Sequence, residues 1–249
     1  MTKIISIANH KGGVGKTTTT VNLAAGLNQK GKKVLCIDLD PQTNLTQSLG
    51  VNEYEYSIYD SLTQNSDLIP IPIRKGFDII PSHIDLSGAE VELINEPGRE
   101  YILKELLNKI KANYDFVFID CPPALGLLTV NAFVASDKLL IPLQAEFLAT
   151  QGLAKLIEII EKVKERINPE FELGGVILTQ FNNRRVLNKD IAWSVEQHFG
   201  EKLFESTIRE NISLAEAPAV GMDIFKYNDK SIGAHDYSQL AEEFLSKIN

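Results

Sequence analysis

Short apolar runs alternate with segments of helical periodicity along the whole chain. Seven apolar runs are predicted strands: Lys3–Ala8, Val34–Asp38, Phe77–Ile80, Phe116–Asp120, Lys138–Pro142, Leu173–Thr179 and Leu203–Ile208. Most of these runs are continuously apolar and do not alternate with polar residues, which is typical of strands covered on both faces. The pattern therefore predicts a sheet with both faces buried.

Helical periodicity appears between these runs. It covers Tyr101–Ala112, Thr150–Ile167 and Asp236–Ile248, each with an apolar stripe on one face. The alternation of strands and helices predicts an α/β fold: a doubly wound, mostly parallel sheet flanked by helices on both faces. Residues 51–75 mix polar and aromatic positions without a clear period, and they are predicted to form an irregular excursion.

The chain is predicted to form a single domain over residues 1–249, without an N-terminal helix-turn-helix extension. It contains no internal repeat and no linker rich in proline, glycine and serine. It carries no signal-peptide pattern at its start, and its apolar runs are far shorter than the roughly 18–20 residues that cross a membrane. We therefore expect a cytoplasmic protein without stable membrane association.

Composition and net charge limit the classes of protein to which this chain can belong. Hydrophobic residues make up 44% and charged residues 23%, which is ordinary for a globular domain. The net charge of −8 excludes a generally basic nucleic-acid coat protein but leaves room for a local basic patch. Cys36 and Cys121 lie at the edges of apolar runs and are predicted to be buried, inert thiols.

A glycine-rich segment follows the first predicted strand and opens a predicted helix that ends near Gly31. It reads Lys11-Gly12-Gly13-Val14-Gly15-Lys16-Thr17-Thr18. Glycines let the backbone approach a phosphate closely, and the N–H groups of the loop and helix N-terminus bind its oxygens. Lys16 is predicted to reach the β- and γ-phosphates and Thr17 to ligate Mg²⁺. The segment therefore predicts a phosphate loop that binds ATP with Mg²⁺.

Carboxylates follow two of the predicted strands. Four apolar residues, 116–119, precede Asp120, which is the Walker B arrangement and is predicted to hold Mg²⁺ opposite Thr17. The strand that begins at Val34 ends in Asp38, with Asp40 two residues later. Open α/β sheets bind ligands outside the carboxyl ends of their strands, so these groups are expected in one crevice, with Asp38 near the metal.

Three motifs resemble the ParA/Soj family of DNA-partitioning ATPases, within the ParA/MinD class of P-loop proteins. They are K-G-G-x-G-K-T-T at 11–18, D-x-D-P-Q at 38–42 and D-C-P-P-x-L-G at 120–126. His10 stands where the common Walker A pattern has its first glycine, and Lys11 is the additional lysine of the deviant form. Shorter matches at 81–82, 88–90, 215–218 and 231–234 extend the resemblance over nearly the whole chain.

The resemblance implies a mechanism. Lys11 would cross the interface of an ATP-dependent sandwich homodimer and contact the partner's ATP, as a lysine counterpart of an arginine finger. Asp40 would orient the attacking water, so the catalytic set is Lys11, Lys16 and Asp40. The family further implies weak ATP hydrolysis stimulated by a ParB-type protein. It implies a dimer that binds duplex DNA of any sequence, is nucleoid-associated when ATP-bound, and segregates plasmids or chromosomes.

The resemblance places the DNA-binding cations in the C-terminal third, at Arg184, Arg185, Lys189, Arg209, Lys226 and Lys230. Residues 209–213 depart from the family's frequent P-R-N-V-R, because Glu210 and Ser213 replace both arginines. Residues 184–230 contain seven Lys/Arg and eight Asp/Glu, so only a spatial patch would serve. We expect weaker DNA binding than in relatives that keep those arginines.

Four alternative functions place different demands on the sequence. A MinD-like membrane ATPase uses a basic amphipathic C-terminal helix, but residues 240–249 hold one lysine and two glutamates, which favours core packing. Nitrogenase-type iron proteins need cluster-ligating cysteines after the Walker B strand, and Cys36 and Cys121 flank the nucleotide motifs instead. A P-loop small-molecule kinase or ligase stays open. So does a non-catalytic nucleotide switch, against which Asp40 argues.

Overall fold

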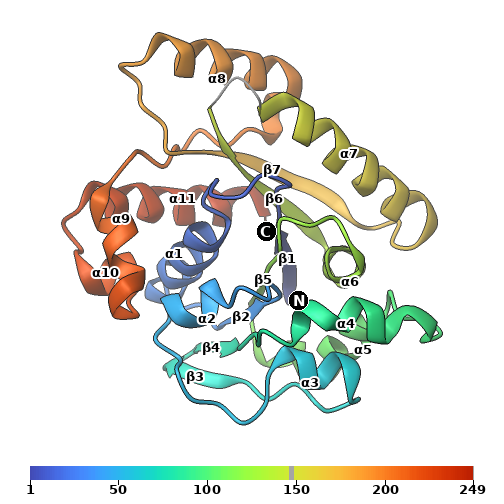
Figure 1. Ribbon diagram of the computed structural model, residues 1–249. Coiled ribbons are helices and arrows are strands. Elements are labelled where there is room, and N and C mark those ends of the chain that lie inside the picture. Colours follow the sequence, from blue (N-terminus) through green and yellow to red (C-terminus); the bar gives the residue numbers. More distant parts are fainter. Residues whose placement is uncertain (146–148, 249) are drawn as a thin grey trace.

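A seven-stranded sheet forms the centre of the molecule (Figure 1). The computed structural model describes the backbone of residues 1–145 and 149–248. It describes the side chains of residues 1–145 and 155–248. The strands are β1 (Lys3–Ile7), β2 (Val34–Asp38), β3 (Ile71–Arg74), β4 (Phe77–Ile80), β5 (Phe116–Asp120), β6 (Lys138–Gln144) and β7 (Glu172–Thr179). Their order is β3-β4-β2-β5-β1-β6-β7, and every neighbouring pair is parallel except β3–β4. The predicted mostly parallel sheet is confirmed.

Helices cover both faces of this sheet, as predicted. They are α1 (Lys16–Gln29), α2 (Asn44–Ser48), α3 (Ile58–Thr63), α4 (Leu86–Glu92), α5 (Ile102–Ile110), α6 (Leu127–Ala135), α7 (Ala149–Arg166), α8 (Val186–Phe199), α9 (Ile212–Glu216), α10 (Ile224–Tyr227) and α11 (Ile232–Ile248). Short 3₁₀ turns follow α4, α5, α8 and α9, at Leu93–Asn95, Lys111–Asn113, Gly200–Lys202 and Ala217–Val220. One core layer joins the sheet to α3–α8, and the other joins it to α1, α2 and α9–α11.

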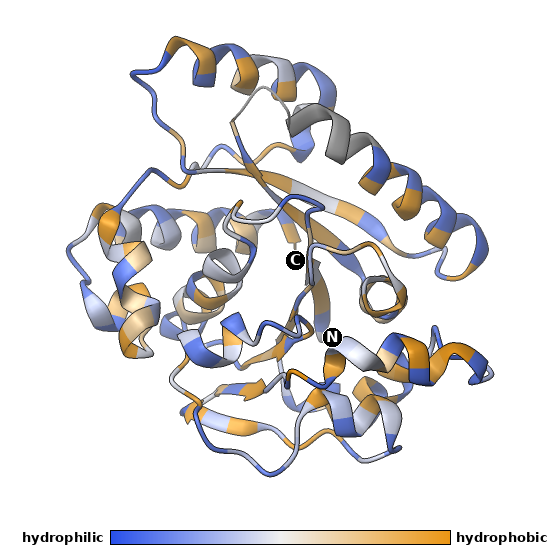
Figure 2. Cartoon of the chain, viewed as in Figure 1, coloured by the Kyte–Doolittle hydropathy of each residue, from blue (hydrophilic) through white to orange (hydrophobic). Residues whose placement is uncertain are grey.

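The continuous apolar runs of the strands supply both core layers. Side chains alternate between the two faces of a strand, so Val117 and Ile119 of β5 face one layer while Phe116 and Phe118 face the other. Figure 2 shows the resulting band of hydrophobic strands between helices that are polar on their outer sides. Cys36 and Cys121 are buried free thiols, one in each layer, as predicted.

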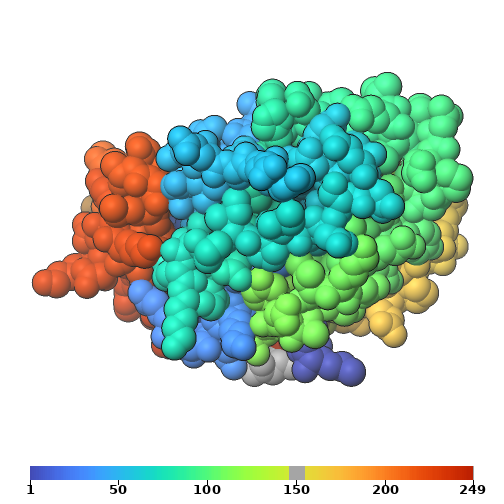
Figure 3. Space-filling view, turned by 90° about the horizontal axis from the view of Figure 1, so that it is seen from below, coloured from blue at the N-terminus to red at the C-terminus, as the bar shows by residue number. Residues whose placement is uncertain are grey.

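The expectation of an irregular segment at 51–75 is wrong, because this segment contains α3 and β3. α3 begins with a capping box in which the side chains of Ser57 and Asp60 pair with each other's backbone N–H. β3 is an edge strand, antiparallel to β4, with Pro72 exposed. Elements this short leave no periodic signature, and Figure 3 shows the segment (light blue to cyan) spread over the molecular surface.

The predicted strand at 203–208 is also wrong. This segment runs beside β7 but makes only isolated bridges, Val176 with Leu203 and Phe181 with Arg209. The backbone N–H groups of Glu205 and Ser206 donate to the carboxylate of Glu243, each at 2.8 Å. Because α11 supplies this competing acceptor, the backbone between the bridges pairs with a side chain and no continuous ladder forms.

The C-terminal helix α11 is a core element. Its buried face includes Leu240 and Phe244, and the Phe244 ring lies 5.4 Å from that of Phe116 and 5.7 Å from that of Phe118. The core-packing interpretation of the tail is therefore confirmed up to Ile248, while Asn249 lies outside the described residues. Among the helices of residues 1–145 and 149–248, none combines the length and apolar character that crossing a bilayer demands.

Removing the Phe244 ring tests this packing. Phe244→Ala leaves a cavity between α11 and β5, so the free energy of unfolding should fall by about 3–5 kcal/mol in urea titrations. The matched control is Leu245→Ala on the same helix, which is only partly buried and should lose much less. Equal losses for the two variants would contradict a core role for this helix face.

Candidate nucleotide-binding site

The glycine-rich segment forms a turn between β1 and α1, as predicted. Gly13 and Gly15 have φ angles of +72° and +86°, which residues other than glycine adopt only with strain. A Cβ at Gly12 or Gly13 would meet nothing within 4 Å, so the loop faces open space. Helix α1 begins at Lys16, and its unpaired N–H groups and positive dipole end lie at the loop. This is a cradle shaped for an anion.

A cavity of about 420 Å³ lies over the loop. The predicted residues that line it are Gly12, Gly13, Gly15, Lys16, Thr17, Thr18 and Asp40. The structure therefore brings the phosphate loop and Asp40 together. Further lining residues were missed by sequence reasoning: Gln42, Asn44, Ser48, Pro123 and Gln180. Of these, Gln42 and Pro123 lie within family motifs, but neither had been given a role in the site.

Lys16 is the buried cation of this cavity. Only 7% of the residue is exposed, and its Nζ donates to the carbonyl oxygen of Lys11 at 3.3 Å. Burial lowers the pKa of the Lys16 ammonium, and the charges of Asp120 and Asp40 oppose this effect. An ammonium stripped of water in this way gains from phosphate oxygens that replace its hydration.

Thr17 and Asp120, the predicted Mg²⁺ ligands, meet at the carboxyl edge of the sheet, and their role in holding the metal stays a prediction. The Thr17 hydroxyl donates to Asp120 Oδ2 at 2.6 Å, and the Thr20 hydroxyl donates to Oδ1 at 3.2 Å. Hydroxyl and carboxylate oxygens are the ligands that Mg²⁺ prefers. In the described part of the chain, no group of three or more His, Cys, Asp and Glu side chains is placed to hold a metal. The pair therefore fits a Mg²⁺ that takes its other ligands from phosphate and water.

Asp120 and Asp38 lie side by side on β5 and β2, paired in register. Both are fully or almost fully buried. Burial, reinforced by the neighbouring charge of Asp38, raises the pKa of Asp120 to about 8. Burial likewise raises the pKa of Asp38 to about 6, against the lowering effect of its hydrogen bonds. The site therefore holds an excess of negative charge that a divalent cation would relieve.

Both carboxylate oxygens of Asp38 accept hydrogen bonds from neighbouring residues of the protein. Its Oδ2 accepts hydrogen bonds from the Thr46 N–H at 2.8 Å and the Thr46 hydroxyl at 2.7 Å. Its Oδ1 accepts from the Asp40 N–H at 3.2 Å, while Asp40 Oδ1 accepts from the Gln42 N–H at 3.0 Å. Asp38 thus ties the loop that carries Asp40 to the sheet, and its place near a metal stays a prediction.

Two glutamines at the ends of β6 and β7 brace the phosphate loop. Lys11 Nζ donates to Gln144 Oε1 at 3.5 Å, and Gln144 Nε2 donates to Gln180 Oε1 at 2.9 Å. Gln180 Nε2 in turn donates to the Gly13 carbonyl oxygen at 2.7 Å. Both glutamines lie at or just after the carboxyl ends of strands. Because open α/β sheets bind ligands at that edge, this position was the sequence signal that could have assigned them to the site. The predicted contact of Lys11 with a partner's ATP stays a prediction.

A second cavity of about 310 Å³ adjoins the first, because Gly15, Thr18 and Gln180 line both. Its wall combines apolar with polar side chains, including Ile208, Arg209, Asn211, Leu214 and Tyr237. Tyr237 lies on α11 and its hydroxyl is 3.2 Å from that of Thr19 on α1. Sequence reasoning did not place these residues at the site, because they come from segments far apart in the chain.

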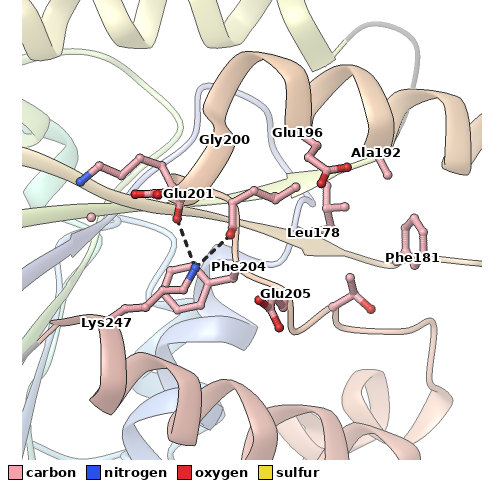
Figure 4. Close-up of a pocket in the computed structure, with 13 residues that line it drawn as sticks. Leu178, Phe181, Ala192, Glu196, Gly200, Glu201, Phe204, Glu205 and Lys247 are labelled. Carbon is pink, nitrogen blue, oxygen red and sulfur yellow. Dashed lines mark hydrogen bonds between the residues drawn. The ribbon is translucent and has the colours of Figure 1, made fainter.

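A larger hollow of about 790 Å³ lies away from the phosphate loop, between α8, β7 and α11 (Figure 4). Lys247 Nζ points across it and donates to the carbonyl oxygens of Glu201 at 3.2 Å and Leu203 at 3.1 Å. Glu196, Glu201 and Glu205 outnumber Lys202 and Lys247 among its lining residues, so its wall is acidic on balance and suits phosphates less well than the glycine loop does. Size therefore does not make this hollow the nucleotide site.

The predicted DNA-binding cations differ in their surroundings. Arg209 pairs with the buried Asp236, and its Nε lies 3.1 and 3.0 Å from the two carboxylate oxygens. This hydrogen bonding raises the pKa of Arg209 and anchors the segment before α9 to α11. Arg185 pairs with Glu210 at 3.1 Å. Arg209 is thus placed as a structural ion pair, and Arg185 shares its charge with an acidic neighbour.

The remaining predicted cations, Arg184, Lys189, Lys226 and Lys230, are exposed or partly exposed. Arg184 lies just before α8 and Lys189 lies in its first turn, whereas Lys226 lies in α10 and Lys230 lies three residues after it. Figure 1 shows where α8 and α10 lie. The Arg185–Glu210 ion pair brings the loop before α8 next to the segment before α9. The structure therefore supplies two small clusters of cations from this set, and their role in DNA binding stays a prediction.

The β1–loop–α1 unit and the Asp120 strand end define a P-loop NTPase. A family model described as an AAA domain matches residues 2–173. The chain is 44% identical to the sporulation initiation inhibitor protein Soj of Bacillus subtilis, over 98% of both chains. It is 41% identical to the chromosome partitioning protein ParA of Caulobacter vibrioides, over 98% of this chain and 94% of that one. The chain belongs to the ParA/Soj family of partitioning ATPases.

A solved structure agrees with this fold. It is described as cobyrinic acid a,c-diamide synthase from Mycobacterium smegmatis with bound ADP and magnesium. It is 33% identical, has a TM-score of 0.86, and the match covers 98% of this chain and 94% of that one. The same protein has also been solved with an ATP analog and magnesium. The doubly wound P-loop fold predicted from the sequence is confirmed.

The raised pKa of Asp120 predicts an unusual pH dependence of stability. Without a metal, the folded protein binds this proton more tightly than the unfolded chain. The free energy of unfolding should therefore decrease as pH rises from about 4 to about 8, by up to about 1.4 kcal/mol per pH unit. Asp120→Asn should flatten this slope between about pH 6 and pH 8, above the raised pKa of Asp38, and be more stable than wild type at pH 8 in urea titrations with a chelator.

The control is Asp67→Asn, a highly exposed aspartate paired with Lys109, which should leave the slope unchanged. A wild-type slope that survives Asp120→Asn would show that other groups bind the proton.

Proposed function

We infer that the protein binds and hydrolyses MgATP, with the phosphates over the glycine loop and the base in the adjoining cavity. The observation that carries this inference is the joint between the two cavities at Gly15, Thr18 and Gln180. One is lined by a helix N-terminus and a buried lysine beside the Thr17–Asp120 pair. The other is lined by apolar side chains such as Ile208 and Leu214, together with the amide groups of Gln180 and Asn211 and the charged Arg209 and Glu210. Together they match the polar and apolar halves of a nucleotide.

The residues divide the work of hydrolysis. Lys16 neutralises charge on the outer phosphates, and the loop N–H groups bind their oxygens. Thr17 and Asp120 would hold Mg²⁺, and the ion would supply positive charge that neutralises the phosphates. Asp40, which faces the same cavity, orients the attacking water, and its loop is held in place by Asp38. The cost of arranging these groups is met in folding, before ATP arrives.

ATP also joins two subunits in this proposal. Lys11 lies at the rim of the phosphate cradle, where its ammonium is already close to Gln144. In the sandwich homodimer it exchanges this contact for the partner's phosphates and cancels charge in the transition state. The family membership supports this step, since the additional lysine is the feature that sets the deviant loop apart.

The dimer binds duplex DNA of any sequence and, with a ParB-type protein that stimulates hydrolysis, segregates a plasmid or chromosome. The relatives named Soj and ParA support this role. Nucleoid association of the ATP-bound form follows from it. The alternative of a MinD-like membrane ATPase is disfavoured, because the apolar face of α11 packs against the core.

A second candidate is amidation of a small molecule with ATP. The observation that favours it is the similarity to the Mycobacterium smegmatis protein, which is named a cobyrinic acid a,c-diamide synthase. Stimulation of ATP turnover separates the two candidates. A partitioning ATPase responds to DNA together with a partner protein, whereas a synthase responds to its acid substrate and an amide nitrogen donor.

Two substitutions separate hydrolysis from dimerisation. Asp40→Ala should retain MgATP binding and accumulate dimers, because the water-orienting carboxylate is lost while the phosphate cradle is kept. Lys11→Ala should bind ATP and stay monomeric, because charge cancellation across the interface is missing. Sedimentation with MgATP measures both, with Lys16→Ala as the variant that loses ATP binding. A monomeric Asp40 variant or a dimeric Lys11 variant would contradict the sandwich proposal.

DNA binding should require the ATP-bound dimer, because one subunit of this acidic chain offers few cations from the predicted set. Gel shifts with Asp40→Ala and MgATP across a salt range should give a log–log slope of about −0.9 per phosphate contacted. Lys226→Ala and Lys230→Ala should each make that slope shallower, by roughly one unit for every phosphate that is no longer bound.

The matched control for these shifts is Lys109→Ala on α5, an equal loss of charge at an exposed position outside the C-terminal third. If the trapped dimer ignores DNA even at low salt, the segregation role is refuted. Binding of the same dimer to anionic vesicles would then favour the MinD-like alternative.

A further inference from the structure

Glu90 of α4 caps a helix that it does not belong to. Its Oε1 accepts a hydrogen bond from the Leu128 N–H at 3.1 Å, in the first turn of α6. The residue at the cap position of α6 is Gly126, which has no side chain to accept that bond. A carboxylate is well suited to this place, because the N-terminus of a helix carries unpaired N–H groups and partial positive charge. α4 and α6 lie next to each other in Figure 1.

Glu90 fills the space in which a side chain at Gly126 would lie. A Cβ built on Gly126 would lie 2.2 Å from Glu90 Oε1 and 2.7 Å from Oε2, which is far inside van der Waals contact. Its backbone is ordinary, with φ −97° and ψ −161°, so any residue could adopt it. The carboxylate thus occupies the space of the missing side chain. We call this pair the Glu90–Gly126 contact.

The Glu90–Gly126 contact adjoins the phosphate cavity. Residues 121–126 connect Asp120 at the end of β5 to the start of α6, and Pro123 of this segment lines the cavity. The segment is also tied to α6 by the Thr129 hydroxyl, which donates to the Ala124 carbonyl oxygen at 2.6 Å. The position of the α6 N-terminus therefore sets the position of one wall of the site.

We propose that Glu90 is a positioning residue for ATP hydrolysis, because its carboxylate fixes the segment between Asp120 and α6. The proposal rests on the ATPase function proposed above. Glu90 acts through the 121–126 segment and not on the phosphates, since its hydrogen bond is made to the Leu128 N–H. Asp120 has independent support from Thr17 and Thr20 and from the pairing of β5 with β1 and β2. Loss of Glu90 should therefore affect hydrolysis more than nucleotide binding.

The test measures ATP affinity, kcat and the hydrogen exchange of residues 126–130 in wild type and variants. Glu90→Ala should lower kcat roughly three- to tenfold and leave ATP affinity within about twofold, because small displacements near reacting groups mainly affect the transition state. Exchange at the Leu128 N–H should rise. Glu90→Gln keeps an oxygen acceptor and should restore most of kcat, which a purely charge-based effect would not do.

Gly126→Ala supplies the decisive comparison. Alone it should lower kcat at least as much as Glu90→Ala, because the new methyl group and the carboxylate cannot share one space. Combined with Glu90→Ala the methyl group has room, so the double variant should be no worse than Glu90→Ala alone. This non-additivity is the signature of a direct contact. Thermal unfolding and circular dichroism check that each variant folds.

Glu92→Ala is the matched control. It removes a carboxylate from the same helix, where Glu92 faces the Tyr59 hydroxyl at 3.2 Å, and it should leave kcat unchanged. Additive losses from Glu90→Ala and Gly126→Ala, or unchanged exchange at Leu128 in Glu90→Ala, would overturn the positioning role. If folded wild-type protein has no ATPase activity, the proposed function itself fails, and the exchange data still decide whether the contact caps α6.

Discussion

Burial of like charge at the carboxyl edge of the sheet is the constraint on which the site depends. Asp38 and Asp120 are neighbours in register on β2 and β5, and neither is reached by bulk water. Such a pair is costly unless protons, cations or hydrogen bonds compensate it. The raised pKa values of both groups are the protein's response without a metal. Lys16 lies close enough to oppose the charge of Asp120.

Hydrogen bonds to the two carboxylates offset the cost of burying them, and they fix the positions of the loops that supply the donors. Thr17 and Thr20 of α1 donate to Asp120, so the phosphate loop and the helix that follows it are tied to β5. Thr46 and the Asp40 N–H satisfy Asp38, which ties the β2–α2 loop to the sheet. The groups that would face a nucleotide therefore come from separate loops but share one rigid edge.

The C-terminal region compensates buried charge in a different setting. Asp236 on α11 is buried, and the guanidinium of Arg209 compensates it. Arg209, which the resemblance assigned to DNA binding, therefore anchors the segment that lines the second cavity. The Glu243 carboxylate on the same helix accepts hydrogen bonds from the backbone N–H groups of residues 205 and 206. Helix α11 thus positions the segment before α9 at two points, through Asp236 near the second cavity and through Glu243 farther from it.

Much of this protein could be predicted from its sequence, because the signals concerned are local. Continuous apolar runs mark strands buried on both faces, and the order of strand, glycine loop, Lys16 and helix specifies a phosphate site within a few residues. The six strands common to prediction and structure follow from such signals. The gathering of Asp40, Thr17 and Asp120 at one edge follows from the rule that open α/β sheets bind ligands outside the carboxyl ends of their strands.

Only the tertiary structure decided which side chain meets which across the fold. Residues 203–208 look like a strand by composition, yet α11 takes two of their N–H groups. Gly126 resembles any loop glycine until Glu90 is seen in the space of its side chain. Arg209 is a free cation in the sequence and an ion pair in the fold. Propensity and periodicity act within a few residues, whereas these partners lie 27 to 38 residues apart and meet only when the layers pack.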